Sequence, residues 1–115
     1  MTFFSSISNT NVQRSEFIEI LNKIDFRDAI ETSNVQLVDV RTISEYQMGH
    51  IEKALHIDYY QQVTFLEEFE KLDKERPVYI YCLSGVRSQQ AAIRLVKMGF
   101  VKIYDLHGGY RTWQQ

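Results

Sequence analysis

The segment that decides the fold is VYIYCLSGVRS, which runs from Val78 to Ser88. Its first four residues are β-branched or aromatic and follow Pro77, so they predict a buried strand that ends at Cys82. Beyond Ser88 the apolar residues recur at helical spacing, and we expect Ser88 to cap a helix that ends at Gly99. The only cysteine of the chain therefore lies in a turn between a strand and a helix.

This turn favours negative charge. The free backbone N–H groups at a helix N-terminus point outward, and the helix dipole adds partial positive charge there. Gly85 lets the loop curl so that successive N–H groups face one centre, and Arg87 adds a positive charge. These features predict a reactive Cys82 thiolate in a pocket that could also hold an oxyanion. The alternative is a buried cysteine with a purely structural role.

Three further motifs accompany the loop. In chain order the four motifs are DVR at 39–41, EYQMGHIEKA at 45–54, CLSGVR at 82–87 and LHGGYRTW at 106–113. Together they resemble the motifs of the rhodanese-like sulfurtransferases, specifically the single-domain members of that family. The resemblance covers residues 37–115 strongly and is weak upstream. It implies sulfur transfer without a metal, nucleotide or organic cofactor.

The resemblance also implies the roles of site residues. Cys82 would be the catalytic nucleophile, taking sulfur from thiosulfate or a persulfide and holding it as a cysteine persulfide. The acceptor must be external because the chain has no second cysteine: cyanide in the test tube, and a small or protein thiol in the cell. The residues expected to bind substrate are Arg41, Leu83, Ser84, Gly85, Val86, Arg87 and Ser88.

Arg41 and the histidines have alternative interpretations. The arginine that matches Arg41 in the family lies near the active site, whereas an ion pair with Glu45 is the structural alternative, and the two are compatible. We interpret His50 as a turn residue, with a catalytic pair with Cys82 as the alternative. His56 and His107 lack the spacing of a metal site.

Three other functions share features with this sequence. A phosphatase or arsenate reductase would need a C-x5-R loop, but here the spacing is C-x4-R and Tyr81 precedes the cysteine in place of histidine. A docking module without catalysis does not explain the retained Cys82. A persulfide carrier dedicated to one protein partner stays open, because Arg87 is the only charge in the loop.

Composition limits the partners and the number of domains. A chain of 115 residues with 44% hydrophobic residues can form one core but not two. We expect a flexible leader over residues 1–14 and a single rhodanese domain over residues 15–115. The net charge of −2 and the lack of a basic run argue against nucleic acid or membrane partners. One unpaired cysteine and no signal or membrane segment predict a cytoplasmic protein.

Helix and strand signals alternate along the chain, which predicts an α/β domain with a mainly parallel central sheet flanked by helices on both faces. The expected strands are 36–40, 55–57, 78–81 and 102–105, and the expected helices before the cysteine are 44–48 and 62–71, the latter with Phe65, Leu66 and Phe69 facing inward. Residues 15–24 have helical spacing after Ser15, whereas the family resemblance implies a short strand near here and a helix that starts at Asp25, and both interpretations stay open. Arg41 and Cys82 would lie at the carboxyl ends of strands, where such sheets bind ligands.

Overall fold

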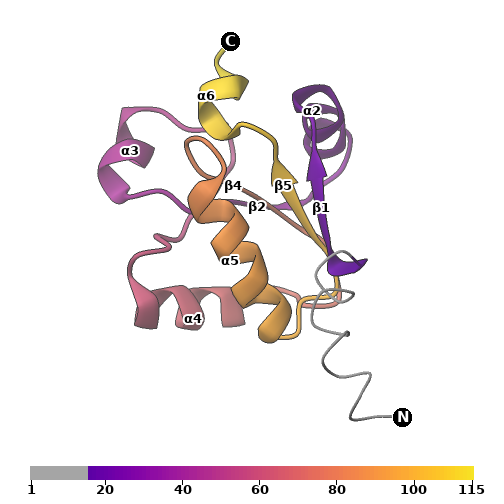
Figure 1. Ribbon diagram of the computed structural model, residues 1–115, viewed down its shortest axis with the longest axis vertical. Coiled ribbons are helices and arrows are strands. Elements are labelled where there is room, and N and C mark those ends of the chain that lie inside the picture. The colour runs from indigo at the N-terminus through magenta and orange to yellow at the C-terminus, as the bar shows by residue number, and fades with distance from the viewer. Residues whose placement is uncertain (1–15) are drawn as a thin grey trace.

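The computed structural model describes residues 16–115, so the leader expected over residues 1–14 lies outside the described residues (Figure 1). Strands and helices alternate along the chain. They are β1 (Ile18–Leu21), α2 (Lys23–Thr32), β2 (Gln36–Asp39), α3 (Ile43–Met48), β3 (Leu55–His56), α4 (Gln62–Glu70), β4 (Val78–Tyr81), α5 (Val86–Lys97), β5 (Ile103–Leu106) and α6 (Gly109–Trp113).

The five strands form one sheet in the order β1-β5-β4-β2-β3, and every neighbouring pair is parallel. The chain steps from β2 to β3 in one direction and then returns to place β4 on the other side of β2. Because parallel crossovers are right-handed, this reversal sends the connecting helices to opposite faces. The carboxyl ends of β2 and β4 therefore flank the switch point of the sheet, where ligands bind in folds of this kind.

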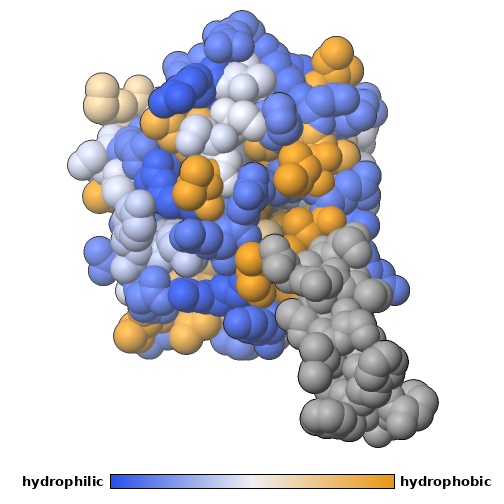
Figure 2. Space-filling model, in the orientation of Figure 1, coloured by the Kyte–Doolittle hydropathy of each residue, from blue (hydrophilic) through white to orange (hydrophobic). Residues whose placement is uncertain are grey.

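Each face of the sheet is covered by its own helices. On one face, Phe65 and Phe69 of α4 and the alanines of α5 pack against Val38, Ile80 and their neighbours. On the other face, residues of α2, α3 and α6 pack against alternate strand residues, which are Leu37, Tyr79, Tyr81 and Leu106. The expected α/β fold with helices on both faces is confirmed. Viewed from the α5 side, the surface is largely hydrophilic, with apolar residues in several separate groups (Figure 2).

The structure answers two expectations about individual elements. Residues 18–21 form a strand, and the following helix begins at Lys23, two residues earlier than expected, because the Asn22 side chain accepts a hydrogen bond from Asp25 N and caps it. Leu66 was expected to face inward but is 45% exposed. Phe65 and Phe69, four residues apart, fill the buried face of α4 without it.

Candidate active site

Cys82 lies directly after β4, at the switch point of the sheet. The preceding residue pairs with β2, since Val40 N donates to Tyr81 O at 3.0 Å. The loop then turns back, so that Gly85 N donates to Cys82 Sγ at 3.0 Å. Gly85 has φ of 117°, a conformation that favours glycine, and it is the N-cap of α5. Cys82 is only 1% exposed, so the loop encloses the sulfur.

The first turn of α5 differs from the expected one. The helix begins at Val86 and has no side-chain cap, so the assignment of Ser88 as the capping residue is wrong. The left-handed Gly85 starts the helix earlier and leaves Ser88 buried inside the first turn. There the Ser88 hydroxyl lies 3.4 Å from Cys82 Sγ and 3.3 Å from Gly85 O.

The remaining backbone donors of the loop are available. Within residues 16–115, no acceptor is found for the N–H groups of Leu83, Ser84, Val86, Arg87 and Ser88. Three of these groups belong to the first turn of α5, where helical N–H groups have no partner within the helix. The helix dipole adds partial positive charge at the same place. The loop therefore presents a set of N–H donors beside the sulfur.

Arg87 is not the isolated cation that the sequence suggested. Its two terminal nitrogens donate to the two carboxylate oxygens of Glu45 at 2.8 and 3.0 Å. These hydrogen bonds lower the pKa of Glu45 to about 2, although burial opposes the shift. Hydrogen bonding to Glu45 also raises the pKa of Arg87, and the Cys82 sulfur contributes in the same direction. Glu45 stays in place because it forms a capping box with Thr42 at the start of α3.

Arg41 pairs with Asp39 and not with Glu45, which corrects the structural alternative drawn from the sequence. Arg41 Nε and Nη2 donate to the Asp39 carboxylate at 2.6 to 3.1 Å, and Nη2 also donates to Gly49 O at 2.7 Å. The Arg41 side chain is 3% exposed, and its guanidinium lies 4.4 Å from the centre of the Tyr110 ring. Within residues 16–115, Nε and Nη2 of this guanidinium have hydrogen-bond partners and Nη1 has none.

Helix α6 lies against the cysteine loop, above the start of α5 in Figure 1. Tyr110 N donates to Cys82 O at 2.8 Å, and Arg111 N donates to Leu83 O at 3.0 Å. Gly109 allows this approach, because a Cβ atom there would lie 2.5 Å from Cys82 O and Leu83 O. Gly109 of the last motif therefore sets how closely α6 approaches the cysteine loop.

Two residues of the site escaped the sequence analysis. The sequence indicates Glu45 only as a partner of Arg41, and it indicates Asp105 only as the end of a strand. Asp105 is 1% exposed on β5, and burial raises the pKa of its carboxyl group to about 7. A signal was present, since Asp105 is a charged residue inside the otherwise apolar and aromatic strand Ile103–Leu106.

The histidines are used elsewhere. His50 stacks on the Tyr46 ring at 3.7 Å, and its Nδ1 lies 2.8 Å from Tyr46 O, as suits a turn residue. His56 Nε2 lies 2.7 Å from Arg41 O. Across residues 16–115, no group of three His, Cys, Asp or Glu side chains is arranged to hold a metal ion. In the same range no helix is both long enough and apolar enough to cross a membrane.

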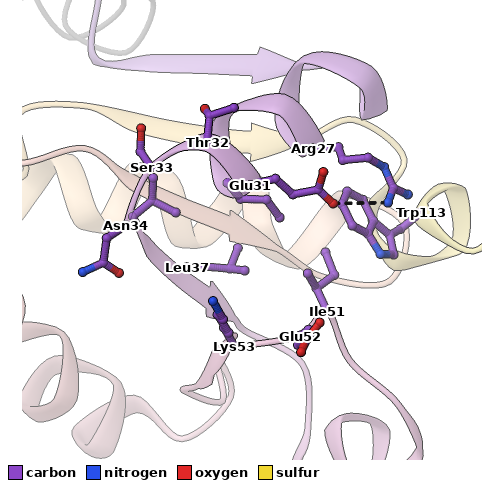
Figure 3. A pocket seen from close by; sticks show the side chains of 12 residues that line it. Arg27, Glu31, Thr32, Ser33, Asn34, Leu37, Ile51, Glu52, Lys53 and Trp113 are labelled. Carbon is purple, nitrogen blue, oxygen red and sulfur yellow. Dashed lines mark ion pairs between the residues drawn. The ribbon is translucent and has the colours of Figure 1, made fainter.

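A cavity of about 660 Å³ lies on the α2 side of the molecule (Figure 3). Leu37 and Ile51 contribute to its apolar lining, and Trp113 lines one end, where Arg27 lies 4.1 Å above its ring. Arg27 also pairs with Glu31 at 3.6 Å. No residue of the cysteine loop lines this cavity, so it is separate from the site around Cys82.

Comparison with known proteins agrees with the fold and the motifs. The model of the rhodanese-like domain matches residues 23–115. The thiosulfate sulfurtransferase GlpE of Coxiella burnetii is 36% identical over 95 residues, which cover 82% of this chain and 85% of that protein. The uncharacterized protein YqhL of Bacillus subtilis is 34% identical over 102 residues, which cover 89% of this chain and 77% of that protein.

Solved structures give the same result. The crystal structure of a rhodanese-like domain protein from Staphylococcus aureus matches with a TM-score of 0.70 and 27% identity, covering 83% of this chain and 90% of that chain. The human single-domain sulfurtransferase TSTD1 shares the fold, with a TM-score of 0.70 at 23% identity over 83% of this chain and 94% of that chain.

The fold and site together define an α/β protein that holds one cysteine in a loop of backbone donors at the switch point of a parallel sheet. The chain belongs to the rhodanese-like domain family. Its family and relatives support a rhodanese-type sulfurtransferase.

Proposed function

We propose that this protein transfers a sulfane sulfur from thiosulfate or a persulfide to a thiol acceptor through a persulfide on Cys82. The observation that carries the proposal is the hydrogen bond of 3.0 Å from Gly85 N to Cys82 Sγ, in a loop whose other N–H groups have no acceptor within residues 16–115. Such a loop stabilises a thiolate before the reaction and an added sulfur after it. The relative from Coxiella burnetii carries the name thiosulfate sulfurtransferase.

The first half-reaction loads the sulfur. The Cys82 thiolate attacks the outer sulfur of the donor, a new S–S bond forms, and the bond inside the donor breaks to release sulfite or a thiolate. Backbone N–H groups of the loop are proposed to hold the donor and then the persulfide; they belong to Leu83, Ser84, Gly85, Val86, Arg87 and Ser88. Arg41 is proposed to bind an anionic donor through Nη1. The small loop, with four residues between Cys82 and Arg87, suits a single sulfur better than a phosphate.

The second half-reaction unloads the sulfur. Cys82 is the only cysteine, so an external acceptor must attack the outer sulfur of the persulfide. Cyanide can serve in the test tube, and a small or protein thiol in the cell. Two separate half-reactions predict ping-pong kinetics. We propose that the reaction takes place in the cytoplasm, because reducing conditions keep an unpaired reactive cysteine in its thiol form. We also propose that residues 15–115 form the single domain that carries it out.

Steady-state thiocyanate formation from thiosulfate and cyanide tests this proposal. The wild type should show parallel lines in double-reciprocal plots, and Cys82→Ser should have no activity above the uncatalysed rate. Arg76→Gln is a matched surface control, since Arg76 is exposed and donates only to a backbone carbonyl, that of Asn34. Activity of Cys82→Ser would overturn the proposal.

A specific observation favours a second candidate, a persulfide carrier for a protein partner. Both arginines of the site have carboxylate partners, Glu45 for Arg87 and Asp39 for Arg41. The pairs weaken the attraction for a doubly charged donor such as thiosulfate. If the carrier function is correct, kcat/KM for glutathione persulfide should exceed that for thiosulfate and should depend little on salt concentration. A higher value for thiosulfate, falling steeply with salt, would exclude it.

A further inference from the structure

The cavity on the α2 side of the molecule takes no part in the reaction proposed for Cys82. Its volume of about 660 Å³ lies within the range of small-molecule sites, which is about 300–1,000 Å³. Leu37 and Ile51 line it and are buried. Its other apolar lining residues are only partly buried, so they leave apolar surface open to a ligand; they are Ile30, Val35 and Trp113. The cavity therefore suits a molecule with an apolar body.

Four charged side chains line the same cavity, and only two of them pair with each other. Arg27 and Glu31 form an ion pair at 3.6 Å. Glu52 and Lys53 are exposed, and neither forms an ion pair within residues 16–115. Together the lining residues offer a ligand one unpaired positive group and one unpaired negative group.

The turn that carries Glu52 and Lys53 is held by hydrogen bonds. Ala54 N donates to Ile51 O at 3.0 Å and closes the turn, and Ile51 N donates to the Tyr81 hydroxyl at 3.0 Å. Lys53 has φ of 74° and is the one residue other than glycine with a positive φ in the described part of the chain. Glycine is the usual residue in such a conformation, and strained residues are concentrated at functional sites. The strain at Lys53 and its lack of a partner both indicate a role for its ammonium group at the cavity.

We propose that the cavity binds a small zwitterion with apolar side chains, namely a short peptide with free termini. The peptide carboxylate pairs with the Lys53 ammonium group, and the peptide ammonium group pairs with the Glu52 carboxylate. A ligand with a single charge would leave one of these two groups without a partner. The apolar side chains of the peptide pack against Trp113 and the other apolar lining residues. Polar side chains that can form hydrogen bonds with a peptide bond lie on the opposite side of the cavity and belong to Thr32, Ser33 and Asn34 (Figure 3).

Nuclear magnetic resonance titration with three related probes tests this proposal. The probes are the dipeptide phenylalanyl-leucine, its N-acetyl form, which lacks the positive charge, and its C-terminal amide, which lacks the negative charge. Trp113 is the only tryptophan, so its indole N–H gives a single resonance. The dipeptide should shift this resonance and the N–H resonances of Leu37 and Ile51 until they saturate. Each blocked form should bind about threefold more weakly, the effect of one partly exposed ion pair.

Two charge variants assign the partners of the peptide termini. Lys53→Gln should weaken binding of the dipeptide and of its N-acetyl form about threefold and leave binding of the amide unchanged. Glu52→Gln should weaken binding of the dipeptide and of the amide and leave binding of the N-acetyl form unchanged. Lys97→Gln removes the charge of an exposed lysine of α5, away from the cavity, and should leave the affinity for all three probes unchanged.

Three results would overturn the proposal. They are equal affinities of the wild type for the three probes, Lys53→Gln and Glu52→Gln variants that bind all three as the wild type does, and no saturable shift at Trp113 below about 10 mM dipeptide. Shifts at the N–H groups of the cysteine loop in place of those at Leu37 and Ile51 would also overturn it. The site is separate from the sulfur chemistry, so Cys82→Ser should bind the dipeptide with the wild-type affinity, and a failure here is distinct from a failure of thiocyanate formation.

Discussion

Substituting Gly109 by alanine should displace the cysteine loop without touching Cys82. The new Cβ would lie 2.5 Å from Cys82 O, Leu83 C and Leu83 O, whereas ordinary contacts begin at 3.4 Å. All three atoms belong to the backbone, so α6 and the loop must separate by roughly 1 Å. The hydrogen bonds from Tyr110 N and Arg111 N to this loop would then lengthen or break.

The structure gives the size of both effects. Alanine at φ of 63° costs about 1–2 kcal/mol, and two backbone hydrogen bonds contribute about 0.5–1.5 kcal/mol each, so the free energy of unfolding should fall by about 2–5 kcal/mol. A displacement of about 1 Å at the reacting group can reduce the rate about 100-fold. Urea denaturation measures the first effect. The value of kcat/KM for thiocyanate formation measures the second.

Gly99→Ala is the matched control. Gly99 also has a positive φ, of 102°, but the nearest atom to its new Cβ is Lys74 Cδ at 3.8 Å, so this variant carries the backbone strain without the clash. It should lose about 1–3 kcal/mol of stability and keep the wild-type kcat/KM. If folded Gly109→Ala also kept the wild-type kcat/KM, the reasoning that α6 positions the loop would be refuted.

Three further predictions concern the buried charges. Glu45→Gln should lower KM for thiosulfate by freeing the charge of Arg87, at a stability cost of about 1 kcal/mol; an unchanged KM would show that the pair does not affect donor binding. Arg41→Met should cost about 3–5 kcal/mol in urea denaturation because Asp39 loses its partner, and Asp39→Asn in the same chain should recover part of it; no loss in the single variant would contradict this. Burial raises the pKa of Asp105 from 3.8 to about 7, so the folded protein binds a proton more tightly than the unfolded chain does. The resulting contribution to the free energy of unfolding, at most about 4 kcal/mol, should be fully present below pH 4 and be lost as the pH rises through 7. An equal dependence of the free energy of unfolding on pH in Asp105→Asn would contradict this.

Local patterns were enough to predict the sheet and the place of the cysteine. The apolar run before Cys82 marks the end of β4, and Gly99 lies just beyond the end of α5, because these signals depend on a few adjacent residues. The capping role of Ser88 was wrong for the same reason. Serine is common at helix starts, which favoured Ser88 as the cap, but here Gly85 in the left-handed conformation begins the helix without a side-chain cap.

The ion-pair partners of the two arginines could not be predicted from the sequence. Spacing suggested Glu45 as a partner for Arg41, but Arg41 precedes α3, so the spacing rule for helices does not apply. Glu45 instead meets Arg87, which is 42 residues away. Such contacts depend on how the elements pack.

The central claim, that Cys82 carries the transferred sulfur, is tested most directly by intact mass spectrometry after incubation with thiosulfate and removal of the excess donor. The wild type should gain the mass of one sulfur atom and lose it again on addition of cyanide, and Cys82→Ser should gain nothing. A parallel incubation with glutathione persulfide identifies the better donor. A wild-type protein that gains no sulfur from either donor, or a Cys82→Ser variant that gains one, would contradict the account.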